Sequence, residues 1–337
     1  MKLRNAILFP LSLMYRLGGR IHRYVVSSRA EHFSIPVLSV GGISAGGSGK
    51  TPFVRALIDL LQEKYYLIIL TRGYGRVEKG EVVLNGGEEG SPDMIGDEPS
   101  LLARSLINGL IGVGSNRAAL LRKILEEHSL PDNSLVILDD GFQHYQLARD
   151  IDIVLIDEQT PNERFLLPAG YLRESPSSLS RAGILVVTNE KGEQMAERHA
   201  RPETLILRSH SEVSSPIHWQ SGKKWEGEKG PVILVTGIAR PERVRTGLQS
   251  EGFMIAAHRK FRDHHRYTQT DIRSIQHWIR SHHAIALITT EKDAVKLERF
   301  PELAQLLYVL PLKTVIREEE QLLAFIQNTI QSRAEPS

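Results

Sequence analysis

A glycine-rich loop between a strand pattern and a helix pattern carries the strongest chemical signal in this sequence. The apolar run at residues 36–40 leads into the loop, and an amphipathic segment at 51–64 follows it. Glycines let backbone N–H groups converge on phosphate oxygens, and the start of a helix adds partial positive charge. The end of the loop, which we expect to bind a nucleoside triphosphate, consists of Gly46, Gly47, Ser48, Gly49, Lys50 and Thr51.

Two side chains of this loop have expected roles. Lys50 is expected to reach the β- and γ-phosphates, and Thr51 to ligate Mg²⁺. Ser44 stands where the usual pattern has its first glycine. The alternative is a glycine-rich turn with a chance Gly-Lys-Thr, but the order of strand, loop and helix favours the phosphate loop.

A second metal carboxylate is expected at the end of an apolar strand. The run 135–138 ends in Asp139 and Asp140, and the run 153–156 ends in Asp157. We expect only one of these strands to lie beside the phosphate loop, and the pattern leaves the choice open. The flanking residues favour the first run, because His144 follows the two carboxylates closely. The alternative for Asp157 is a strand-end cap or a salt bridge.

Two further clusters have residue types suited to proton transfer. Asp97 opens an apolar helical pattern, where it either caps the helix or orients a nucleophile. Asp263 and His264 lie in a later loop and suit proton transfer better than zinc, because no other ligand spacing supports a metal. The alternative for His264 is a solvated loop histidine.

The guanine-recognition pattern Asn/Thr-Lys-x-Asp does not follow any strand with the required spacing. The nearest segments, at 188–191 and 290–293, both miss it. ATP is therefore favoured over GTP as the nucleotide.

These residues require a scaffold of alternating strands and helices. Continuous apolar runs at 66–70, 134–138, 151–156 and 184–187 are typical of strands buried on both faces of a parallel sheet, and predict a three-layer α/β/α lobe. A polar linker at 211–230 is followed by a second, smaller α/β unit at 231–337, so the phosphate-loop lobe is expected at 31–210.

Composition excludes several classes of protein. The 337 residues contain no cysteine, which excludes disulfide scaffolds, Fe–S clusters and thiol nucleophiles. The formal net charge is +2, so a general nucleic-acid binder is not expected.

The first 30 residues have a distinct composition. They hold six Lys or Arg residues and no acidic residue, with apolar side chains between the charges. The uncharged run at 5–15 is too short to span a bilayer. We expect an interfacial helix at the membrane surface, kinked or divided at Pro10 and Gly18. The alternative is a helix packed on the protein's own core.

The ordered motifs resemble one family, the tetraacyldisaccharide 4′-kinases of lipid A synthesis. Gly42, Tyr171 and Arg262 stand where the family usually has Asn, Pro and Pro. The family's own loop also lacks the early glycine. The matching segments are the basic N-terminus, residues 46–52, 72–76, 96–99, 139–144, 167–174, 236–243, 263–265 and 289–294.

The resemblance implies an ATP- and Mg²⁺-dependent kinase that phosphorylates the 4′-hydroxyl of a tetraacyldisaccharide 1-phosphate to form lipid IVA. It implies two α/β lobes joined by a β-ribbon, at the cytoplasmic face of the bacterial inner membrane. No nucleic acid and no obligate protein partner are expected.

The resemblance also assigns roles to individual residues. His264 and Asp97 would form a proton relay, with Asp97 orienting the imidazole. As our own mechanistic hypothesis, Thr51, one of Asp139 and Asp140, and Glu174 would hold Mg²⁺, directly or through water. Two alternatives remain: a membrane-associated switch or targeting ATPase, and a nucleotide-binding module without turnover.

Overall fold

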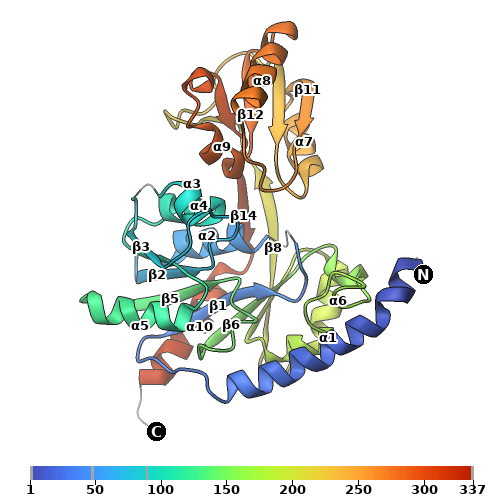
Figure 1. Cartoon of the computed structure of the whole chain (residues 1–337). Helices are drawn as coiled ribbons and strands as arrows, with labels where there is room; N and C mark the ends of the chain where they lie inside the picture. The colour runs from blue at the N-terminus through green and yellow to red at the C-terminus, as the bar shows by residue number, and fades with distance from the viewer. Residues whose placement is uncertain (1–2, 47–48, 89, 335–337) are drawn as a thin grey trace.

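The computed structural model describes residues 3–46, 49–88 and 90–334 and shows an α/β protein with two sheets. Figure 1 shows a larger lobe, built on a nine-stranded sheet, and a smaller lobe above it, built on a five-stranded sheet.

The nine-stranded sheet is mainly parallel, with the order β14-β8-β7-β6-β1-β5-β2-β4-β3. The antiparallel strands β3 and β14 form its two edges. The five strands predicted for this lobe are confirmed, and their apolar side chains are buried on both faces. The strands are β1 (Val37–Gly42), β2 (Tyr66–Thr71), β3 (Val82–Asn85), β4 (Gly109–Val113), β5 (Ser134–Asp139), β6 (Ile151–Ile156), β7 (Ile184–Val187), β8 (Leu205–Val213) and β14 (Leu312–Ile316).

Helices cover both faces of this sheet, which gives the three expected layers. Helices α2, α4 and α10 bury Leu57, Leu102 and Leu322 in one apolar cluster. Helix α5 buries Leu121 in a second cluster on the opposite face. The helices of this lobe are α2 (Lys50–Leu61), α3 (Pro92–Ile95), α4 (Asp97–Ser105), α5 (Arg117–Glu127), α6 (Glu190–His199) and α10 (Glu319–Ala334), with 3₁₀ turns η1 (Thr160–Asn162) and η2 (Pro176–Arg181).

The smaller sheet has the order β11-β10-β12-β13-β9 and its own apolar clusters. A capping box formed by Thr268 and Asp271 opens helix α8 (Gln269–Ser281) of this lobe. Its elements are β9 (Ile217–His218), β10 (Pro231–Thr236), α7 (Pro241–Ser250), β11 (Met254–Lys260), α8 (Gln269–Ser281), β12 (Ala286–Thr289), α9 (Glu291–Leu297), η3 (Pro301–Leu303) and β13 (Leu307–Val309).

The end of the chain differs from the predicted smaller unit at 231–337, because it returns to the larger lobe. Strand β14 pairs antiparallel with β8, and α10 then packs on the nine-stranded sheet. The two lobes are therefore joined by two neighbouring antiparallel strands (Figure 1). Polar residues in β8, such as Ser209 and Ser211, hid this strand in the sequence pattern.

Helix α1 (Leu3–Ser27) lies along the outside of the larger lobe (Figure 1). The predicted division at Pro10 and Gly18 is wrong, because the helix is unbroken across both. Ser12 fixes it to the lobe: its Oγ donates to Leu166 O at 2.8 Å and accepts from Ala169 N at 3.0 Å. Among the described residues, no helix combines the length and apolar content needed to cross a membrane.

Close packing behind the phosphate loop leads to a stability prediction. A Cβ on Gly41, in the central strand β1, would lie 2.4 Å from Phe142 Cβ and 2.8 Å from Phe142 N. Gly41→Ala should therefore lower the free energy of unfolding by about 1–3 kcal/mol, measured by urea denaturation. The matched control is Gly18→Ala in α1, where a Cβ would meet nothing within 4 Å. Equal stability of the two variants would contradict this account.

Candidate active site

The phosphate loop connects β1 to α2 at the carboxyl edge of the nine-stranded sheet. Gly49 has φ +81°, a left-handed backbone that glycine adopts without strain, and α2 begins at the next residue. Lys50 Nζ lies 3.5 Å from Asp140 Oδ1. The predicted phosphate-binding residues Gly47 and Ser48 lie outside the described residues, whereas Gly46, with φ +108°, precedes them.

Both candidate carboxylate strands lie beside β1, so the expectation that only one could do so is wrong. Strand β5 pairs with one edge of β1 and β6 with the other, because an interior strand has two neighbours. Their terminal carboxylates differ in surroundings. Asp157, after β6, accepts a hydrogen bond from Thr160 Oγ1 at 2.6 Å and pairs with Arg240. Asp157 therefore has a structural role, as the salt-bridge partner that the sequence analysis gave as the alternative to a metal ligand.

Asp139, at the end of β5, is a buried carboxylate with too few hydrogen bonds to compensate for its loss of solvent. Thr71 Oγ1 donates to its Oδ2 at 3.3 Å, and its Oδ1 has no hydrogen-bond partner among the described residues. Burial, followed by the charges of Glu98 and Asp140, raises the pKa of Asp139 to about 7. A bound cation would relieve this repulsion, so the site has the chemistry that a divalent metal requires.

Glu98 belongs to this cluster, although the sequence analysis singled out only its neighbour Asp97. Thr51 Oγ1 donates to Glu98 Oε2 at 3.2 Å. The signal was present, because the two acids stand together before α4, but the pattern could not tell which one faces the phosphate loop. The structure points Glu98 toward Thr51 and Asp97 toward the smaller lobe.

The other two predicted metal carboxylates are paired with cations. Asp140 Oδ2 accepts from Arg173 Nη1 at 2.7 Å, and Glu174 Oε2 accepts from Arg181 Nη1 at 2.9 Å. Glu174 also accepts from Gln143 Nε2 at 2.9 Å. In the described part of the chain, no group of three or more His, Asp or Glu side chains could hold a metal alone. A nucleotide's phosphates normally complete a magnesium site of this kind.

A buried arginine that sequence reasoning missed faces the same carboxylates. No nitrogen of the Arg117 guanidinium has a hydrogen-bond partner within the described ranges. Burial and the nearby Arg72 lower the pKa of Arg117 to about 10, although Asp140 and Asp139 oppose this shift. A single arginine at the start of a helix carries no motif, so no sequence signal could have identified it.

Asp97 and His264 are brought together across the two lobes, as the resemblance implied. His264 Nδ1 lies 3.2 Å from Asp97 Oδ2, and Lys296 Nζ lies 3.4 Å from the same oxygen. Burial by itself raises the pKa of Asp97, but the hydrogen bond with His264 and the charges of Lys296 and Lys292 lower it below its usual value. Asp97 is therefore an ionised acceptor for the imidazole.

The partners of His264 define which ring nitrogen carries its proton. Asp97 can only accept, so Nδ1–H donates to it. Lys292 Nζ lies 3.2 Å from Nε2, and an ammonium group can only donate. This arrangement leaves Nε2 with a lone pair, as a proton acceptor requires.

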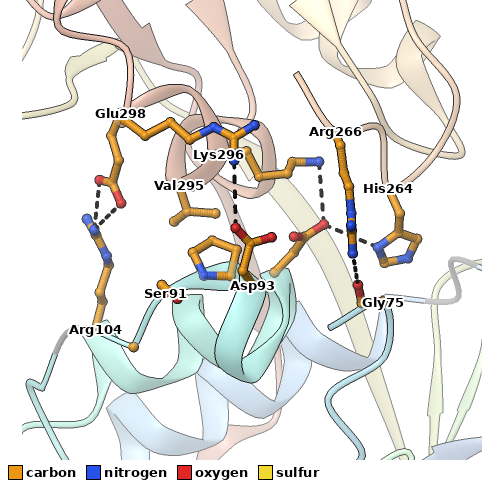
Figure 2. Close-up of a pocket in the computed structure, with 13 residues that line it drawn as sticks. Gly75, Ser91, Asp93, Arg104, His264, Arg266, Val295, Lys296 and Glu298 are labelled. Carbon is orange, nitrogen blue, oxygen red and sulfur yellow. Dashed lines mark hydrogen bonds and ion pairs between the residues drawn. The ribbon is translucent and has the colours of Figure 1, made fainter. Parts of the chain in front are cut away.

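A pocket next to this pair opens between α3 and α4 of the larger lobe and α9 of the smaller lobe (Figure 2). Ion pairs cross it on several sides. Arg104 Nη2 lies 2.7 Å from Glu298 Oε2, and Arg299 Nη1 lies 3.7 Å from Asp93 Oδ2. The site is therefore assembled by the approach of the two lobes.

Comparison with known proteins agrees with this arrangement. The family model described as Tetraacyldisaccharide-1-P 4'-kinase matches residues 4–331. A tetraacyldisaccharide 4'-kinase of Cytophaga hutchinsonii is 32% identical over 97% of this chain and 95% of that protein. Its counterpart from Syntrophus aciditrophicus is 35% identical over 88% of this chain and 86% of that protein.

One solved structure is similar over almost the whole chain. It is the "apo" form of LpxK from Aquifex aeolicus, in complex with ATP, with a TM-score of 0.78 and 28% identity. The match covers 97% of this chain and 99% of that chain. The coverage by the family model and the identity to the curated relatives confirm the resemblance: this chain belongs to the tetraacyldisaccharide-1-P 4'-kinase family.

Proposed function

We propose that this chain transfers the γ-phosphoryl group of ATP to the 4′-hydroxyl of a tetraacyldisaccharide 1-phosphate, which forms lipid IVA. The observation that carries the proposal is the Asp97–His264 pair, which lies across the lobe interface with His264 Nε2 unprotonated and facing the Lys292 ammonium. A kinase that phosphorylates a hydroxyl group needs a proton acceptor beside its phosphate loop. A nucleotide-dependent switch has no lipid hydroxyl to deprotonate and therefore does not need this proton acceptor.

The phosphate loop and the carboxylate cluster would bind the nucleotide. Lys50 and the loop amides contact the β- and γ-phosphates. Thr51 and Asp139 would hold Mg²⁺, and Glu98 would join them, because it already accepts from Thr51. When it is bound, the ion would neutralise negative charge on the phosphates. Asp140, paired with Lys50 and Arg173, lies next to this set.

Glu174 has a more distant role than that of a direct metal ligand. Its oxygens accept from Gln143 and Arg181, and Arg23 Nη1 of α1 lies 3.6 Å from Oε2. We therefore assign it a contact to Mg²⁺ through water and a structural link between α1 and the site.

His264 Nε2 takes the proton of the acceptor hydroxyl as its oxygen attacks the γ-phosphorus. The bond from the γ-phosphorus to the β–γ bridging oxygen breaks, and ADP leaves with that electron pair. Asp97 keeps the imidazole oriented and stabilises the imidazolium that forms. Because the two residues come from different lobes, chemistry requires closed lobes.

The segment 1–30 would bring the site to the cytoplasmic face of the inner membrane, where ATP is present. One face of α1 contacts the larger lobe through Ser12, while apolar side chains elsewhere on the helix face solvent. Leu13, Met14 and Leu17 are 58%, 70% and 61% exposed. Arg16 lies between Met14 and Leu17, and Arg20 follows three residues after Leu17. Exposed apolar groups between arginines suit the boundary of an anionic bilayer.

The first prediction tests the reaction itself. With γ-labelled ATP, Mg²⁺ and tetraacyldisaccharide 1-phosphate in mixed micelles, label should appear on the 4′-oxygen of the lipid. Lys50→Ala should remove most of the turnover, because the loop loses its phosphate-binding ammonium. Release of free phosphate with the lipid unlabelled would instead favour the switch ATPase.

The second prediction tests the proton relay. His264→Ala and Asp97→Ala should each reduce kcat by about 10²- to 10⁴-fold in the same assay. The double variant should be scarcely slower than either single variant, because the two side chains act as one unit. Losses that multiply fully would contradict the relay.

The third prediction tests the membrane surface. Leu13→Glu combined with Met14→Glu should reduce co-sedimentation with vesicles that contain anionic phospholipid, because charged groups replace exposed apolar ones. The matched control is Ile107→Glu, which changes a side chain 79% exposed in the turn between α4 and β4. Equal partitioning of both variants would remove α1 as the membrane contact.

A further inference from the structure

One lysine of the smaller lobe reaches between the carboxylate cluster and the base. Lys292 lies in the first turn of α9, and its Nζ lies 3.4 Å from Glu98 Oε1 and 3.2 Å from His264 Nε2. Glu98 contacts Thr51 at the phosphate loop through its other oxygen. The Lys292 ammonium is thus located on the path from the phosphate-binding residues to the proton acceptor.

The transferred phosphoryl group must travel along the same path. It leaves the nucleotide beside Thr51 and joins an oxygen whose proton goes to His264. We propose that Lys292 is a catalytic lysine supplied by the smaller lobe, whose ammonium binds the γ-phosphoryl oxygens during transfer. This proposal rests on the proposed function and adds the group that stabilises the negative charge of the transition state.

The surroundings keep Lys292 charged and aimed at this position. Its side chain is 16% exposed, and Asp263 Oδ1 lies 3.1 Å from Nζ. Burial lowers the pKa of Lys292, but the carboxylates of Glu98, Asp263 and Asp97 outweigh this effect and raise it. Asp263 comes from the same lobe as Lys292, so it can position the ammonium without competing for the phosphate loop.

Two neighbouring cations, Lys296 of α9 and Arg55 of α2, form ion pairs with other carboxylates. Lys296 is buried between Asp97 and Asp293, with Nζ 3.1 Å from Asp293 Oδ1. Arg55 of α2 pairs with Glu291 of α9 at 2.6 Å, which holds the start of α9 against the helix that follows the phosphate loop. This ion pair is one of several across the lobe interface, together with Arg104–Glu298 and Arg299–Asp93.

The contacts of Lys292 would exchange when the substrates bind. Glu98 would then be available to hold the metal, and the acceptor hydroxyl would donate its hydrogen bond to His264 Nε2. The ammonium then loses two of its partners and binds phosphoryl oxygens instead. Lys292 forms no covalent bond and keeps its protons: the acceptor oxygen gains the γ-phosphorus, His264 gains the hydroxyl proton, and ADP leaves with the electron pair of the broken bond.

The absence of cysteine from the chain permits a direct test. Lys292→Cys introduces a single thiol, and alkylation with 2-bromoethylamine restores an ammonium of nearly the same length. Lys292→Cys should reduce kcat by about 10²- to 10⁴-fold, with little change in KM for ATP. Aminoethylation should restore at least a tenth of wild-type turnover, whereas alkylation with iodoacetamide, which adds a neutral group, should not.

Two controls separate this role from lobe closure and from damage by the reagent. Wild-type protein has no thiol, so the same treatment should leave its turnover unchanged. Arg55→Gln removes an ion pair across the same interface and should cost less than tenfold. Lys292→Cys with turnover within threefold of wild type, or a folded aminoethylated protein without recovery, would overturn the proposal.

A measurement without lipid distinguishes this proposal from the proposed function. ADP with Mg²⁺ and aluminium fluoride resembles the transferring phosphoryl group, and its binding can be followed by calorimetry. Lys292→Met should weaken that binding at least tenfold and leave ADP binding nearly unchanged. If wild-type protein fails to label lipid but shows this dependence, the acceptor is wrong and the lysine assignment stands. Equal fluoride complexes in both proteins would reject the lysine, whatever the acceptor.

Discussion

The hydrogen bond between Asp97 and His264 is the interaction on which the rest of the site depends. It joins residues 167 positions apart in the chain, one from each lobe. The protonation of each side chain depends on its partners. Asp97 fixes the tautomer of the His264 imidazole, and the lysines Lys292 and Lys296 of the smaller lobe lie near enough to keep Asp97 ionised. Ion pairs such as Arg55–Glu291 and Arg104–Glu298 support this closed arrangement.

The charges at the carboxyl edge of the larger sheet are not fully balanced within the protein, and this imbalance favours the binding of a cationic ligand. Asp139 and Asp140 end a buried strand, and Glu98 approaches them from α4. Lys50 and Arg173 neutralise Asp140, whereas Asp139 retains a raised pKa. Such unbalanced charge lowers stability when no ligand is present, and a metal–nucleotide complex can compensate it.

The joining of the lobes follows from the topology. Two antiparallel strands, β8 and β14, run between the sheets, and the chain crosses twice before it ends in α10 on the larger lobe. A double connection restricts the approach of the smaller lobe more than a single flexible linker would. The connection therefore limits the orientations in which the smaller lobe can place His264 and Lys292 against the larger lobe, while α1 lies along another side of the larger lobe (Figure 1).

The sequence by itself determined the local features. The phosphate loop and the buried strands of the larger sheet depend on neighbouring residues, so their patterns predicted them. The ordered motifs also indicated the family and, through it, Asp97 and His264. Only the tertiary structure decided how distant residues meet. It placed β5 and β6 on both sides of β1, returned β14 to the larger sheet and turned Glu98 toward Thr51. It also buried Arg117 and brought Lys292 to His264. These outcomes depend on packing and charge between segments far apart in the chain, which no local pattern of residues contains.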